Sequence, residues 1–168
     1  MPSRRGDSVL GAILLGGALV FSAALSARYS PAPIHPRRWA YYRRLAKPAF
    51  TPPDYAFAVW GPLWLALAVA GWRLWRAPKS RARSRALLHW FAAQALNPVW
   101  LWLGFRRRNR GAMALEGAGA VANAVALADA ARRTDSMAGV LSLPYLAWIG
   151  FAGLLSEELW RLNRNREA

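Results

Sequence analysis

All 23 lysine and arginine residues of this chain lie outside five long apolar stretches. The stretches are 8–27, 55–72, 86–105, 111–128 and 137–156. A helix needs about 20 mostly apolar residues to cross a hydrocarbon core about 30 Å thick. The pattern therefore predicts an all-α membrane protein, a five-transmembrane-helix bundle that forms a single domain over residues 1–168.

We expect helices at about 8–27, 55–75, 86–105, 111–130 and 137–160, and a long loop at 28–54. The first stretch also has features of a signal peptide, with basic residues before it and small residues near its end. Its apolar run of about 19 residues exceeds the about 7–15 of a signal peptide, so a retained helix is favoured.

A formal net charge of +15 fits either a nucleic-acid-binding protein or a membrane protein with basic loops. Because the basic residues flank the apolar stretches, we expect membrane lipid as a partner and no nucleic acid. The chain has no cysteine, which excludes disulfides, Cys-ligated metal sites and a thiol nucleophile. No phosphate loop, HExxH or GxSxG motif occurs, so the sequence favours a binding protein over an enzyme, with no required cofactor and no metal site.

Five helices place the two termini on opposite sides of the membrane. The side of the N-terminus carries ten basic residues, and the side of the C-terminus carries thirteen. The positive-inside rule then predicts a multi-pass protein of the bacterial cell membrane with the N-terminus outside and the C-terminus inside.

Large aromatic residues from three predicted helices fall at one depth. At 1.5 Å per residue they lie roughly 9 to 15 Å below the surface on the C-terminal side. Two interpretations remain open. These residues either fill a core or line a pocket for a planar apolar ligand, because such a ligand needs aromatic walls with a few polar groups. The candidate ligand-binding residues are Trp60, Trp64, Asn97, Trp100, Tyr145 and Trp148.

Two ionisable residues lie inside the predicted spans. Glu116 is six residues from the start of its helix, and we expect it to pair with the basic cluster Arg106–Arg110. His89 could ligate a haem iron, but its position on the other side of the bundle favours an interfacial hydrogen bond.

The loop at 28–54 ends in a proline-rich segment, 47–53, which should be stiff and non-helical. We expect it to act as a lid through Phe50, Pro52, Pro53 and Tyr55. The alternative is a plain connector whose arginines rest on anionic headgroups. The Gly- and Ala-rich stretch 111–128 suits close helix packing and suggests a homodimer face.

Four segments carry a resemblance to a known family. They are 47–57 (KPAFTPPDYAF), 97–100 (NPVW), 144–148 (PYLAW) and 160–163 (WRLN). Their order and spacing resemble the TspO/MBR family, also called translocator proteins, tryptophan-rich sensory proteins or peripheral-type benzodiazepine receptors. Two departures stand out. Trp60 follows Phe57 by three residues where the family usually has four, and the tyrosine of the animal cholesterol-recognition pattern is missing.

The resemblance implies a five-helix bundle, commonly a homodimer, with a ligand cavity under the first loop. The ligands that it implies are tetrapyrroles, such as protoporphyrin or haem, and other planar apolar molecules. The implied function is sensing, regulation or transport of porphyrin-like ligands. The alternatives are a Trp-dependent photo-oxidative porphyrin-degrading enzyme, or a structural membrane protein that has no small ligand.

Overall fold

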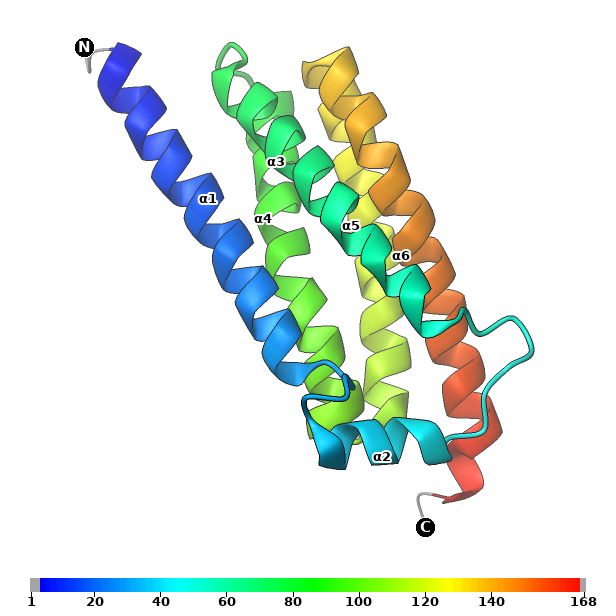
Figure 1. Cartoon of the computed structure of the whole chain (residues 1–168). Helices are drawn as coiled ribbons and strands as arrows, with labels where there is room; N and C mark the ends of the chain where they lie inside the picture. The colour runs from blue at the N-terminus through cyan, green and yellow to red at the C-terminus, as the bar shows by residue number, and fades with distance from the viewer. Residues whose placement is uncertain (1–3, 167–168) are drawn as a thin grey trace.

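The computed structural model describes residues 4–166, which form helices and connections without a strand in that range (Figure 1). The predicted all-α class is confirmed, but the helix count needs correction. The described range holds six α-helices, because the first loop contains a short one, α2, whose start is favoured by a proline at the first helical position. The α-helices are α1 Arg4–Tyr29, α2 Pro36–Arg44, α3 Trp60–Arg76, α4 Arg81–Leu101, α5 Arg110–Thr134 and α6 Ser136–Asn163.

Five long helices form a bundle whose main contacts follow a closed ring, and α3 also contacts α4 and α5. The order around the ring is α1, α4, α5, α6 and α3, and α3 returns to α1. The short α2 crosses the end of the bundle opposite the N-terminus (Figure 1). Three short elements extend the long helices: 3₁₀ turns at Asp54–Val59 and Arg164–Arg166, and a π-helical turn at Trp102–Arg106.

Four of the long helices, α1, α3, α5 and α6, are long and apolar enough to cross a membrane by length and composition. The fifth, α4, begins at Arg81 rather than at the predicted 86, so its first turns carry Arg81, Arg83 and Arg85. These arginines lower its hydropathy, although α4 lies within the same ring.

Both turns at the N-terminal end of the bundle are fixed by arginine. Arg83 donates to the carbonyl oxygens of Leu74 (3.1 Å) and Trp75 (2.6 Å), which caps the end of α3. Arg73 donates to both carboxylate oxygens of Asp135, at 2.8 and 2.9 Å. This contact and the Ala138 amide hold the pKa of Asp135 below its usual range, and Asp135 also caps α6.

The half of the bundle nearest the N-terminus is solidly packed around Trp90. This side chain is fully buried, and its Nε1 donates to the Leu67 carbonyl at 2.8 Å. Gly71 faces the indole of Trp90, and a Cβ on this glycine would come within 2.7 Å of that side chain. Alanines on α4, α5 and α6 surround it, so small residues make room for one large aromatic.

This packing predicts that Gly71→Ala destabilises the protein by about 1–3 kcal/mol, because the added methyl overlaps Trp90. Gly61→Ala on the same helix is the control, since nothing lies within 4 Å of a Cβ there. The control should be neutral or stabilising, as expected for Gly→Ala in a helix. Denaturation of the detergent-solubilised protein, followed by circular dichroism, measures both. Equal stabilities of the two variants would contradict this account of the core.

Candidate ligand cavity

The half of the bundle nearest the C-terminus is hollow. A cavity of about 470 Å³ lies there, with walls from all five long helices and from α2. Its volume is within the range of small-molecule sites, which is about 300–1,000 Å³. Its lining is mostly apolar and aromatic, and includes five of the six candidate ligand-binding residues: Trp60, Trp64, Asn97, Trp100 and Trp148.

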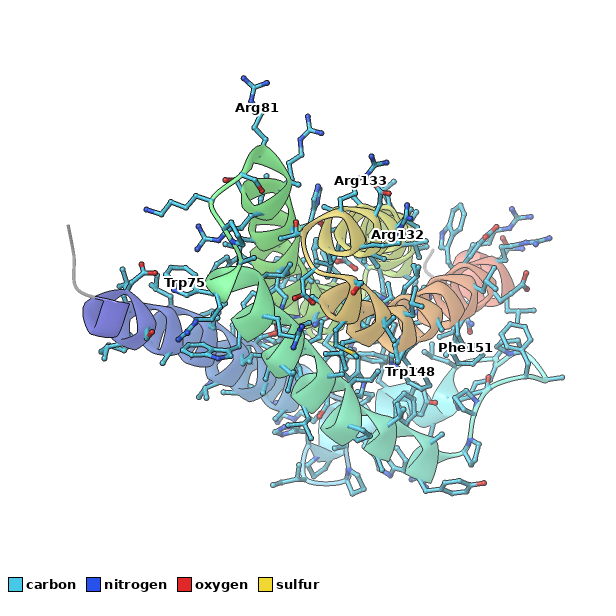
Figure 2. All side chains as sticks on the ribbon, turned by 90° about the horizontal axis from the view of Figure 1, so that it is seen from above. Trp75, Arg81, Arg132, Arg133, Trp148 and Phe151 are labelled. Carbon is cyan, nitrogen blue, oxygen red and sulfur yellow. The ribbon has the colours of Figure 1, made fainter. Side chains whose placement is uncertain are left out.

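One wall is a cluster of aromatic rings from α3 and α6. The ring of Trp60 lies 5.4 Å from that of Trp64 and 6.4 Å, edge to face, from that of Trp148. Trp148 also stands 5.6 Å from Phe151 along α6 (Figure 2). Offset and edge-to-face contacts of this kind orient the rings and stabilise the wall.

The spacing of three residues between Phe57 and Trp60, where the family usually has four, has a structural reason. The residues before it, Asp54–Val59, form a 3₁₀ helix. In a 3₁₀ helix, side chains three positions apart lie on the same side of the helix. In an α-helix, side chains that share a face are three or four positions apart. Phe57 and Trp60 accordingly both contact Trp148, at 6.1 and 6.4 Å between ring centroids. The three-residue spacing is therefore compatible with a Trp60 that faces the cavity.

A second wall comes from α4 and its π-helical end. Trp100 donates from Nε1 to the Ser156 hydroxyl at 2.8 Å, which fixes the plane of its indole. Phe105, in the π-helical turn, packs edge to face against Trp100 and Tyr42, at 5.9 Å from each. Phe105 is not among the predicted site residues, because an uninterrupted α-helix was expected there, although Pro98 upstream signals a local irregularity.

Tyr145 lies behind the cavity lining. It is 1% exposed, and its hydroxyl donates to Oδ1 of Asn97 at 3.1 Å. This bond orients the Asn97 amide, whose Nδ2 is buried without a hydrogen-bond partner among the described residues. Tyr145 is thus a positioning residue for Asn97, while Asn97 itself reaches the cavity.

Glu116 does not form the expected ion pair. Both of its carboxyl oxygens are buried and have no hydrogen-bond partner in the described part of the chain, and the residue lines the cavity. Arg106, Arg107 and Arg108 are exposed instead, because the π-helical turn before them directs this loop outward. The short sequence distance to these arginines was misleading, since a helix face decides where a side chain points.

The cavity roof differs from the predicted lid. It is formed by the end of α1 and the following residues, Ser30–Pro33, by Trp39 and Tyr42 of α2, and by Asp54. Burial, and secondarily the charge of Asp54, raise the pKa of the Tyr42 phenol. Aromatic residues three apart after a helix-starting Pro36 were the sequence signal for this element.

The four residues predicted as the lid lie outside the cavity lining that the structure describes. They are Phe50, Pro52, Pro53 and Tyr55. Phe50 leans on Phe151 of α6, with ring centroids 6.2 Å apart, and Tyr55 is 81% exposed. The proline-rich segment is non-helical, as expected, but runs along the outside of the roof.

Asn163 joins the segment just after α2, which we call the roof segment, to the end of α6. Asn163, the last residue of α6, accepts from the Ala46 amide through Oδ1 (2.9 Å) and donates from Nδ2 to the Ala46 carbonyl (2.8 Å). Arg110, which is 4% exposed, donates to the Asn163 carbonyl (3.1 Å) and the Tyr41 hydroxyl (2.6 Å). These contacts tie α2, α5 and α6 together beside the cavity.

His89 lies away from this cavity. Its Nδ1 is 2.9 Å from Oδ1 of Asn123, and Asn123 Nδ2 donates to the His89 carbonyl at 3.0 Å. The two residues join α4 to α5. Within the described residues no group of three or more histidine, cysteine or acidic side chains is placed to hold a metal ion.

A closed ring of long apolar helices around an aromatic cavity defines a class: multi-pass integral membrane proteins with a cavity for a small ligand. Within this class, the TspO/MBR family matches residues 10–161, and the chain belongs to that family. The predicted family resemblance is confirmed. Membership supports a membrane sensing or ligand-binding role.

Relatives extend over most of the chain. It is 34% identical over 157 residues to "Tryptophan-rich sensory protein" of Cereibacter sphaeroides, covering 88% of this chain and 92% of that protein. It is 32% identical over 136 residues to "Translocator protein" of Bos taurus, covering 78% of each. It is 28% identical over 152 residues to "Protein CrtK" of Rhodobacter capsulatus, covering 87% and 91%.

The geometry predicts that Asn163→Ala releases the roof segment from α6. Hydrogen exchange at the Ala46 amide should accelerate about tenfold or more, because one hydrogen bond to a buried partner is worth about 1–3 kcal/mol. Asn165→Ala, at an exposed position two residues on, should leave that exchange unchanged. Unaltered Ala46 exchange in Asn163→Ala would show that the roof is held by other contacts.

Proposed function

We propose that the protein binds planar tetrapyrroles, such as protoporphyrin or haem, in this cavity and acts in their sensing, regulation or transport. The observation that carries the proposal is the convergence of Trp60, Trp100 and Trp148, from three helices, on one cavity of about 470 Å³. Flat aromatic surfaces attract a flat aromatic ring through dispersion and quadrupole interactions, and the apolar lining favours its transfer from water.

Each candidate residue has a separate role in this binding mode. The indoles of Trp60, Trp64, Trp100 and Trp148 stack against the ring, and the free Nδ2 of Asn97 donates to a polar edge. Tyr145 holds the Asn97 amide in place. The proposal rests on ring stacking by these indoles and not on axial ligation of an iron.

The protein surface next to the cavity roof, which we call the rim, carries basic residues that suit the acidic substituents of such a ligand. Exposed arginines project from α2 and from the loop after α4, next to the roof: Arg37, Arg43, Arg44, Arg106, Arg107 and Arg108. Propionate groups that remain at the surface would be attracted by this positive field. The same positive end is the one that the positive-inside rule places in the bacterial cytoplasm, which gives the proposed N-out/C-in orientation.

We also propose a homodimer that packs through α5. Its outward face combines small residues with exposed Leu115 and Val125, at 77% and 52% exposure. Gly119 has no atom of the chain within 4 Å of a Cβ position, so a second helix could approach closely there.

A protoporphyrin titration in the dark tests the proposed ligand. We expect saturable binding to the detergent-purified protein, read by tryptophan quenching and the Soret band. The double variant Trp100→Ala/Trp148→Ala should weaken the affinity by at least about tenfold, because two stacking surfaces are lost. Working in the dark separates binding from any photo-oxidative breakdown of the porphyrin.

The matched control is Trp72→Ala/Trp102→Ala, which removes two tryptophans that are each 37% exposed and outside the lining. Its affinity should equal that of the unaltered protein. The proposal fails if the Trp100/Trp148 variant binds protoporphyrin as tightly as the control, or if binding to the unaltered protein never saturates.

A further inference from the structure

The cavity lining differs from the rest of the chain in its acidic and basic residues. The formal net charge is +15, yet within the described range no lysine, arginine or histidine lines the cavity. The two charged residues in the lining are both acidic, Asp54 and Glu116. The long basic side chains at this end of the bundle therefore surround the cavity without entering it. Figure 2 shows the same tendency at the other end, where Arg81 and Arg133 point away from the helices.

The inner acidic group, Glu116, lacks any partner that would satisfy it. Neither carboxyl oxygen has a hydrogen bond within residues 4–166, and each is buried. A buried carboxyl without a donor costs free energy, and a donor brought by a ligand would recover it. Trp100 is paired with Ser156, and Tyr145 with Oδ1 of Asn97. The Asn97 Nδ2 and the Ser26 hydroxyl, which belong to the same lining, also have no partner among the described residues, and Glu116 is the acidic member of this unpartnered set.

The cavity that Glu116 lines has many aromatic residues in its walls. Aromatic rings attract cations through the negative charge of their faces, and the attraction grows when the cation is shielded from water. A lining that combines tryptophans with an acidic side chain, and in the described range has no basic residue, suits a positively charged or strongly donating nitrogen. A carboxylate would be repelled from the same place.

We infer that the cavity selects planar aromatic molecules that carry an amine or a protonated ring nitrogen, and that Glu116 accepts the hydrogen bond from that nitrogen. The aromatic walls stack on the ring, and Glu116 sets its direction of entry, with the nitrogen inward. The inference rests on the proposed function in one respect only, namely that the cavity is a site for planar rings.

Three probes with one three-ring frame test this selection. They are proflavine, a cationic diamine; acridine, which is neutral in solution; and acridine carboxylate, an anion. Each is titrated at neutral pH into the full-length protein in a neutral detergent, and tryptophan quenching is read against protein-free micelles. The unaltered protein should bind proflavine at least about tenfold more tightly than acridine carboxylate, since a charge-assisted hydrogen bond is worth about 1.5–3 kcal/mol.

Variants assign the preference to Glu116. Glu116→Gln should weaken proflavine binding by about tenfold or more and change acridine binding by less than about threefold. Glu157→Gln, the same change at an exposed position of α6 outside the lining, should alter neither. If Glu116→Gln does not fold, the ranking of the three probes on the unaltered protein still decides the matter.

The outcomes separate this inference from the proposed function. Equal affinities for proflavine and acridine carboxylate, or a Glu116→Gln variant that keeps full proflavine affinity, would overturn the inference. A parallel protoporphyrin titration that saturates would then leave the proposed function standing. Failure of every probe, protoporphyrin included, would overturn both.

Discussion

The roof of the cavity depends on the pairing of the Asn163 side-chain amide with both backbone groups of Ala46. An amide is the side chain that can complete both a backbone donor and a backbone acceptor at once. The pairing holds the segment after α2 against the end of α6, and Arg110 adds a link from α5. The rings of Tyr42 and Phe50 hold the same connection against Phe105 and Phe151, so the asparagine acts together with aromatic packing to keep the roof over the hollow half of the bundle.

Each half of the bundle contains polar groups that are paired in apolar surroundings. In the solid half, Trp90 donates to a helix carbonyl, and His89 and Asn123 satisfy each other. In the hollow half, Ser156 and Asn97 accept from aromatic side chains. The Glu116 carboxyl oxygens, the Asn97 Nδ2 and the Ser26 hydroxyl have no partner among the described residues, and all three residues belong to the cavity lining. Such unsatisfied groups concentrate where a protein is prepared for a ligand rather than where it is packed for stability.

Much of this architecture could be predicted because a membrane restricts the possibilities. Apolar length predicted the long helices, and depth along them grouped Trp60, Trp64, Asn97, Trp100 and Trp148, which the structure places around one cavity. These predictions needed only the rise of a helix and the thickness of a bilayer. The order of the helices around the ring was not accessible in this way, since it depends on which faces pack together.

What the sequence analysis missed lies where the backbone leaves the regular α-helix. The 3₁₀ start of α3 explains the spacing of Phe57 and Trp60, and the π-helical end of α4 directs Phe105 inward. Tyr145 was assigned to the ligand because its spacing matched that of Trp148, but its hydroxyl is already bonded to Asn97. Spacing indicates which face a residue shares; it does not indicate whether its polar group is already satisfied.

The distribution of charge relates the proposed ligand to its orientation in the cavity. Exposed arginines near the roof and the buried carboxyl of Glu116 in the lining form a gradient of charge-bearing groups across the cavity. A molecule with anionic substituents at one edge and nitrogen donors elsewhere is favoured at both ends of that gradient in one orientation only. Because the rim is solvated and Glu116 is buried, salt should weaken the attraction at the rim much more than the contact at Glu116. In the proposed binding mode the arginines of α2 would attract the ligand and Glu116 would select it, so the two roles are separable by experiment.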